Sequence, residues 1–191
     1  MQIRNYSQLN EMFKDKGTTY DEKEFNDFEK EIFNKLEDIN LNDYDLTDVE
    51  KVSVLSIAFA TTHFDKEKYV RMCKILIDLE DSRGYFKLGN FFRSCESIKD
   101  AEKCFLKGIK KFNCVKSKFN LGSIYLRKYI DSKDKNDLIK SECFYKSLDN
   151  ENKLTNFIPL IIIYCCLNDA KSLIKYLGKA IKIGENKCLD I

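Results

Sequence analysis

The chain has 191 residues, of which 34% are charged and 43% hydrophobic, and its formal net charge is +2. One Pro and seven Gly are too few for a disordered or linker-rich chain, and they leave little turn chemistry for a β-rich fold. No signal segment is evident at the start, and the longest apolar run (residues 157–167) is too short to cross a bilayer, so we expect an all-α, cytoplasmic protein without a membrane partner.

Residues 1–46 are predicted to form a helical N-terminal cap. Apolar residues recur at helical spacing along two stripes of this segment. The longer stripe contains Phe25, Phe28, Ile32, Phe33 and Leu36, and the shorter one Tyr6, Leu9 and Phe13. The end of a helical array exposes an apolar face, and we expect this segment to cover it.

Residues 47–191 repeat with a period of about 33 residues. One series is Phe59, Phe92, Tyr125 and Tyr164, and a second is Met72, Phe105, Phe144 and Leu177. Alternating between the two series gives steps of 13 and 20 residues, with one step of 19 caused by a six-residue insertion in the polar stretch 128–137. The period predicts a single domain of about four units, each a pair of helices. The units span residues 48–81, 82–114, 115–153 and 154–186.

The unit at 82–114 carries the most specific pattern. It reads Tyr85-x-x-Leu88-Gly89-x-x-Phe92, followed by Ala101-x-x-x-Phe105-x-x-Gly108. This pattern resembles the tetratricopeptide repeat, and the insertion is also similar to the longer Sel-type helical solenoid repeats. The resemblance implies a right-handed α-solenoid of antiparallel helix pairs. The alternative is an ordinary helical bundle whose periodicity is accidental.

Two local signals accompany the pattern. Small residues are expected where the two helices of a pair approach closely, and they are Gly89, Gly108, Gly122, Ser147 and Ala180. Helix starts are predicted at a capping box of Thr47 with Glu50, and at Asp65, Ser97, Asn150 and Thr155. Pro159 is expected to fall in the first turn after Thr155.

The resemblance implies a binding surface, because the first helix of each tetratricopeptide pair lines a concave face that holds the ligand. The residues at the matching positions are Phe86, Asn90, Arg93, Lys116, Phe119, Ser123, Arg127, Ile158 and Ile162. Phe86, Phe119 and Ile158 would form an apolar ladder, edged by cations that include Arg83. Such a face suits a protein or peptide with apolar anchors and acidic flanks. The alternative is that these side chains pack against neighbouring repeats.

One tetratricopeptide subfamily grips carboxylate-ended chaperone tails with two Lys, two Asn and one Arg. The matching positions here hold Phe86, Asn90, Asn120, Thr155 and Pro159. Both Asn are present and all three cations are missing, so the charge-assisted bonds to a carboxylate would be lost. The sequence therefore argues against chaperone-tail binding.

Catalytic and metal-binding patterns are missing from the sequence. It has no Gly-rich phosphate loop, no G-x-S-x-G and no H-E-x-x-H, and His63 is its single histidine. The eight cysteines include no C-x-x-C pair, which favours free thiols in a reducing compartment over a zinc site. We expect a protein that is not an enzyme, with no catalytic residues, no cofactor and no metal.

The charge is unevenly distributed along the chain. Residues 1–50 have a net charge of −8, and residues 51–191 a net charge of +10. This asymmetry indicates an acidic partner, a contact between the two parts, or simply solvated helix faces. Lys99, Lys103, Lys107 and Lys110 share one helix face, so nucleic-acid binding through phosphates is the alternative function, although no base-stacking platform accompanies them. Self-association through the uncapped C-terminal repeat is a further expectation.

Overall fold

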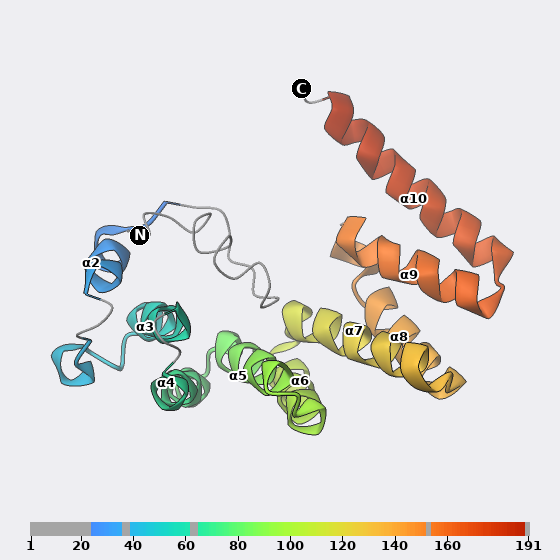
Figure 1. Cartoon of the computed structure of the whole chain (residues 1–191). Helices are drawn as coiled ribbons and strands as arrows, with labels where there is room; N and C mark the ends of the chain where they lie inside the picture. Colours follow the sequence, from blue (N-terminus) through green and yellow to red (C-terminus); the bar gives the residue numbers. More distant parts are fainter. Residues whose placement is uncertain (1–23, 36–38, 62–64, 152–153, 190–191) are drawn as a thin grey trace. The chain divides into compact units, whose positions relative to one another are not determined.

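The structure is a computed structural model that describes residues 24–35, 39–61, 65–151 and 154–189. Its described residues form nine α-helices and two short 3₁₀ turns, which confirms the all-α prediction (Figure 1). The α-helices are α2 (Asp27–Asn34), α3 (Val49–Thr61), α4 (Lys66–Asp78), α5 (Ser82–Ser94), α6 (Ile98–Phe112), α7 (Val115–Ser132), α8 (Lys135–Lys146), α9 (Leu154–Leu167) and α10 (Ala170–Leu189). The 3₁₀ turns are η2 (Leu41–Asp43) and η3 (Asp149–Glu151).

The helices pack mostly against their neighbours in sequence. Contacts join α2 to α3, α3 to α4 and α4 to α5 in one compact unit that ends at Cys104. In a second unit, which begins at Phe105 inside α6, contacts join α7 to α8, α8 to α9 and α9 to α10, and α7 also touches α9. This order of packing is consistent with a helical repeat array. In the described residues, no helix has both the length and the apolar character needed to cross a membrane.

Aspartates begin several of the helices. The carboxylates of Asp48, Asp65, Asp81 and Asp134 accept backbone N–H bonds from the first turns of α3, α4, α5 and α8 at 2.7–3.2 Å. The prediction for Asp65 is confirmed, whereas the Thr47 capping box is wrong, because the Thr47 hydroxyl bonds Asp45 instead. Asn150 and Thr155 are not caps either, since Asn150 lies in η3 and Thr155 inside α9.

Five of the helices are followed by a residue in the left-handed backbone conformation. These residues are Glu80, Glu96, Asn113, Lys133 and Asn168, with φ of 53–61°. After α4, α5 and α9 the following N–H groups bond back to the last helical turn, for example from Asp81 to the Leu76 carbonyl at 2.8 Å. Left-handed caps of this kind stop a helix sharply, so the chain reaches the next helix within two or three residues.

The first unit has its core around α3. Residues 52–59 of this helix are all buried, because α4 packs against α3 and the described N-terminal residues contribute Phe25, Ile32 and Phe33 to the same apolar cluster. α4 adds Met72 and Leu76, both fully buried. The resemblance implies that first helices line a concave binding face. The middle of α3 cannot contribute to such a face, because its side chains are buried.

α4 and α5 approach so closely that their contact has no room for a side chain at Gly84. A Cβ atom at this position would lie 2.7 Å from the Ile77 backbone nitrogen and 2.8 Å from the Cys73 carbonyl oxygen. Both atoms belong to the backbone of α4, so they cannot rotate away. Only glycine allows this helix contact.

The second unit is built around tyrosines and α9. Tyr145, Tyr164, Phe157 and Leu160 are almost completely buried in one apolar cluster. At the contact of α7 with α8, the Ser141 hydroxyl donates to the Gly122 carbonyl at 2.8 Å, and a Cβ on Gly122 would lie 2.7 Å from the Tyr145 ring. The expectation that Gly122 allows a close helix pair is confirmed.

Burial raises the pKa of Tyr145 to about 12, and a hydrogen bond with Ser123 acts in the opposite direction. An unfolded tyrosine ionises near pH 10, so the folded protein resists a deprotonation that the unfolded chain undergoes. The stabilising effect is present below pH 10 and is lost as the pH rises toward 12. We expect the free energy of unfolding to fall by about 1 kcal/mol more in the wild type than in Tyr145→Phe between pH 9 and pH 11.

The measurement is urea unfolding of both proteins at the two pH values. Tyr145→Phe is a matched control because it keeps the ring in the core and removes only the ionisable hydroxyl. Equal losses of stability in the two proteins would show that Tyr145 is not held in an apolar environment.

Candidate protein-binding surface

The predicted surface residues of α5 are half-buried. Phe86, Asn90 and Arg93 each retain partial exposure, and burial lowers the pKa of the Arg93 guanidinium. They belong to the first unit, whereas Phe119 and Ile158 belong to the second. The apolar ladder from Phe86 through Phe119 to Ile158 therefore stays a prediction.

Arg83, which was expected to edge the ladder, is committed to other partners. Its guanidinium donates to Glu50 at 2.8 and 2.9 Å and to Asp81 at 2.9 and 3.0 Å. These bonds tie the start of α5 to the first turn of α3, and the bonds with Glu50 contribute most to raising the pKa of Arg83. Because all three guanidinium nitrogens donate to Glu50 or Asp81, Arg83 joins α3 and α5 within the first unit.

The four predicted residues of α7 divide into two kinds. Phe119 packs edge-on against the Tyr145 ring, with centroids 5.4 Å apart, and Ser123 interacts with the Tyr145 hydroxyl, so this pair contributes to the α7–α8 contact. Lys116 and Arg127 are exposed. Arg127 forms an ion pair with Asp131 at 3.4 Å, and both side chains are open to solvent, so the pair is weak and exchangeable.

α9 carries the clearest exposed apolar residues among the predicted positions. Ile158 is 49% exposed and Ile162 is 44% exposed, although both lie on a helix whose opposite side contributes Phe157, Leu160 and Ile163 to the core. Ile158 and Ile162 are one helical turn apart, and the exposed Cys165 and Cys166 follow in the next turn.

Pro159 lies inside α9 and not at its start, because the helix begins at Leu154. A proline nitrogen has no hydrogen to donate, so the Thr155 carbonyl cannot receive the usual bond from position 159. Thr155 is exposed. The Thr155 carbonyl, which lacks this hydrogen bond, therefore lies at the start of the apolar face of α9.

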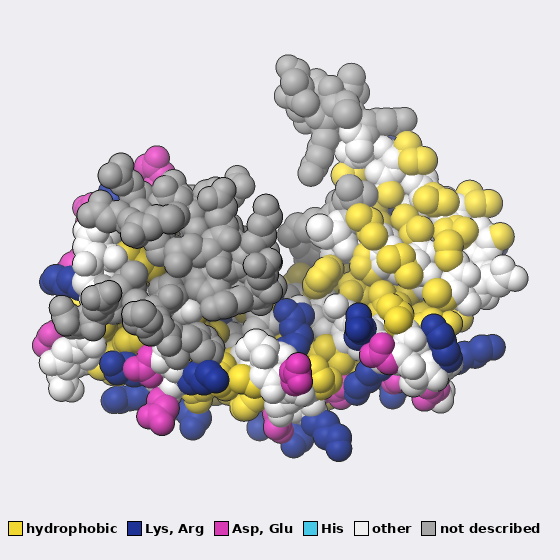
Figure 2. Space-filling model, viewed as in Figure 1, with side chains coloured by type: hydrophobic (Ala, Val, Ile, Leu, Met, Phe, Trp, Pro, Cys, Tyr) yellow, Lys and Arg dark blue, Asp and Glu magenta, His cyan; other side chains and the backbone are white. Residues whose placement is uncertain are grey.

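An apolar stripe on α10 was not among the predicted site residues. Ile174, Leu177 and Ile181 are 69%, 40% and 59% exposed. Figure 2 shows hydrophobic side chains gathered over the part of the surface that α9 and α10 form. Of these three residues only Leu177 belongs to the second repeating series of the sequence, and the series alone does not indicate exposure.

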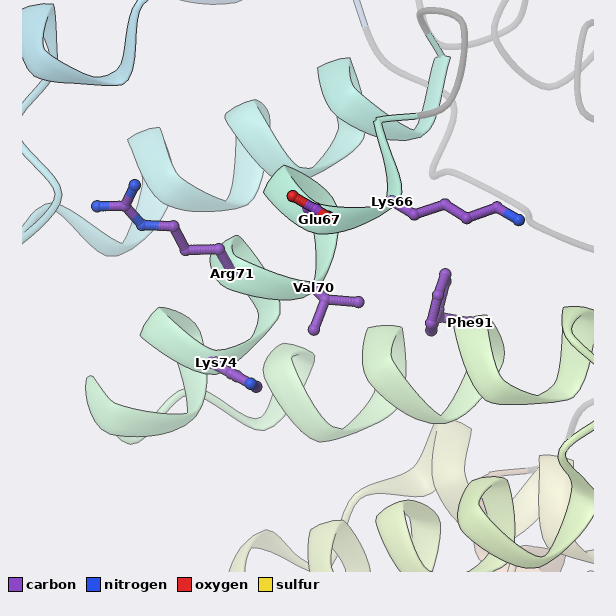
Figure 3. Close-up of a pocket in the computed structure, with 6 residues that line it drawn as sticks. All are labelled: Lys66, Glu67, Val70, Arg71, Lys74 and Phe91. Carbon is purple, nitrogen blue, oxygen red and sulfur yellow. The ribbon is translucent and has the colours of Figure 1, made fainter.

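An open cavity of about 450 Å³ lies between α4 and α5 in the first unit. Val70 and Phe91 point toward each other at its centre, whereas Lys66 and Arg71 extend away from it in opposite directions (Figure 3). Lys74 and Glu67 complete the lining. Because the charged groups do not converge on one point, the cavity resembles a surface groove more than a site for a small charged ligand.

The lysine face of α6 is exposed as predicted. Lys99, Lys103, Lys107 and Lys110 are all open to solvent, and Lys103 forms an ion pair with Asp100 at 3.1 Å. Their spacing places them along one side of a single helix. This face offers positive charge without an aromatic platform beside it.

Metal-ligating side chains do not gather in the part of the chain that the structure describes. No group of three His, Cys, Asp or Glu side chains is arranged to hold a metal ion there. His63 lies outside the described residues. Burial raises the pKa of the Cys73 thiol to about 12, so this buried cysteine stays protonated and unreactive.

Comparisons with known proteins give no further guide to identity. No protein-family model matches the chain, and no curated protein matches it.

Proposed function

We propose that the protein is a non-catalytic scaffold or adaptor that binds another polypeptide through the exposed faces of α7 and α9. In this proposal the helix pairs form a right-handed, tetratricopeptide-like or Sel-type solenoid, and the faces of the first helices form its concave side. Seven described cysteines are free thiols, which supports a reducing, cytoplasmic location. The observation that carries the proposal is the exposure of Ile158 and Ile162 on a helix whose opposite side is core.

The chemistry of the two faces indicates the kind of partner. Covering an exposed isoleucine removes apolar surface from water, and burying such a side chain fully contributes about 1.5–3 kcal/mol. α7, which touches α9, adds the exposed cations Lys116 and Arg127. A partner carboxylate can replace Asp131 at Arg127 at little cost, because that ion pair is solvated. A peptide with apolar anchors and acidic flanks fits both features.

The proposal is tested with a fluorescent pool of peptides that have apolar centres and acidic flanks. We expect Ile158→Ser combined with Ile162→Ser to weaken binding by about tenfold or more, since both anchors lose apolar contact. Ile139→Ser is the matched control, because Ile139 is 50% exposed on α8 and belongs to no proposed face. Anisotropy titrations give the three dissociation constants. Equal affinity of the double variant and the wild type would contradict the assignment.

The exposed lysine face of α6 supports nucleic-acid binding as a second candidate. A pool of mixed oligonucleotides, titrated at two salt concentrations, separates the two functions, because phosphate contacts weaken steeply as salt rises. The peptide proposal expects apolar anchoring that changes little with salt. Tight oligonucleotide binding that is lost when Lys99, Lys103, Lys107 and Lys110 are changed to Gln would favour the second candidate.

A further inference from the structure

The outer stripe of α10 is an apolar surface distinct from the face of α9 described above. Ile174, Leu177 and Ile181 are spaced three and four residues apart, so they form one continuous ridge along the helix. All three are exposed. The part of the surface that contains α10 is visibly rich in hydrophobic side chains in Figure 2.

The positions that match Leu177 and Ile181 earlier in the chain are mostly buried. Ile181 lies 33 residues after Leu148, which follows the end of α8 and is buried in the cluster that contains Phe157 of α9. Met72 and Leu76, which hold the places of Leu177 and Ile181 in α4, are fully buried in the apolar cluster of the first unit. Ile174, Leu177 and Ile181 therefore form an exposed stripe against which one more helix could pack.

The charge beside the stripe decides what kind of helix fits it. Residues 170–184 contain four Lys and no Asp or Glu. At 100° per residue, Lys171, Lys175 and Lys182 fall in one sector that adjoins the apolar ridge. In a two-fold antiparallel pairing of two copies, this lysine edge would face the lysine edge of the other copy, which is repulsive. A helix with an acidic edge is attracted instead.

We propose that Ile174, Leu177 and Ile181 bind an amphipathic helix of another polypeptide, whose apolar face is bordered by Asp or Glu. The incoming helix covers the ridge, and its carboxylates meet Lys171, Lys175 and Lys182. This interaction goes beyond the proposed function, because it uses a different face of the molecule and different residues.

The experiment uses the full chain and two synthetic helical peptides with the same leucine stripe. One peptide carries Glu along the edge of the stripe and the other carries Lys. We expect the Glu peptide to bind the wild type at least about tenfold more tightly than the Lys peptide. In a protein that already carries Ile158→Ser and Ile162→Ser, so that the face of α9 does not contribute, binding should weaken at least about tenfold when Ile174, Leu177 and Ile181 are also changed to Ser, whereas Ile139→Ser should leave it unchanged. Anisotropy measures each affinity, and circular dichroism checks that every variant keeps its helices.

Three results would overturn the proposal. The first is equal affinity of the Glu peptide for the protein that carries Ile158→Ser and Ile162→Ser and for the same protein with the triple change added. The second is a dimer in sedimentation equilibrium that the triple change abolishes and the Glu peptide does not dissociate, which would make a second copy the occupant. The third is binding to vesicles with anionic headgroups that depends on the three residues while the Glu peptide fails to bind, which would make the stripe a membrane-surface anchor.

Discussion

Changing Gly84 to Ala will lower the free energy of unfolding of the first unit by about 2–3 kcal/mol. The added methyl group would stand 2.7 Å from the Ile77 nitrogen and 2.8 Å from the Cys73 carbonyl oxygen. α4 and α5 must separate to accept it, and the separation would loosen contacts such as the ring pair of Tyr69 and Phe91, whose centroids are 5.9 Å apart. This loss exceeds the gain of up to about 1 kcal/mol that alanine normally brings to a helix interior.

Gly178→Ala is the matched control for this prediction. Gly178 lies within α10, and a Cβ there would meet no atom within 4 Å. The same substitution should therefore stabilise the protein by about 0.5–1 kcal/mol. Urea unfolding followed by circular dichroism gives both values, and the rate of thiol labelling at the buried Cys73 reports the opening of the first unit. A Gly84→Ala protein as stable as the wild type would contradict the close contact of α4 and α5.

Changing Phe157 to Ala will destabilise the second unit by about 3–5 kcal/mol. The Phe157 ring is fully buried and packs against Tyr176, with ring centroids 5.9 Å apart, so its removal leaves a cavity between α9 and α10. Tyr164 and Leu160 line the same cluster and cannot fill the space without leaving their own contacts.

The neighbouring residue provides the control. Ile158→Ala changes an exposed side chain on the other side of α9 and should cost less than about 1 kcal/mol. Thermal unfolding of the two variants measures the contrast. Similar losses at 157 and 158 would show that α9 is oriented differently, and the proposed binding face would then be wrong.

The helices were predictable because their signal is local. The stripes of α3 to α10 repeat at helical spacing, and turn chemistry is scarce, so each predicted unit can be divided into two helical segments without knowledge of distant contacts. The insertion at 128–137 is instructive. α7 has 18 residues where α5 has 13, and the loop after α7 spans only 133–134, so the added residues lengthen the helix and not the loop.

The binding surface was less predictable, because burial depends on the neighbouring helix. Phe119 and Ile158 hold the same position in the repeat pattern, yet the Phe119 ring packs against Tyr145 while Ile158 stays exposed. Arg83 likewise looked like an edge of the groove until its bonds to Glu50 and Asp81 were seen. The tight contact at Gly84 has no pattern signal, since it depends on the backbone of another helix.

Site-specific photocrosslinking from position 162 tests the central claim that the exposed face of α9 binds a polypeptide. A photoreactive amino acid is placed at Ile162 in one protein and at Ile139 in a control, and both are irradiated in extract of the source cell. The account predicts a discrete adduct from position 162 that protease removes, nuclease leaves intact, and the acidic-flanked peptide pool suppresses. Identical adducts from both positions, or an adduct that nuclease removes, would contradict it.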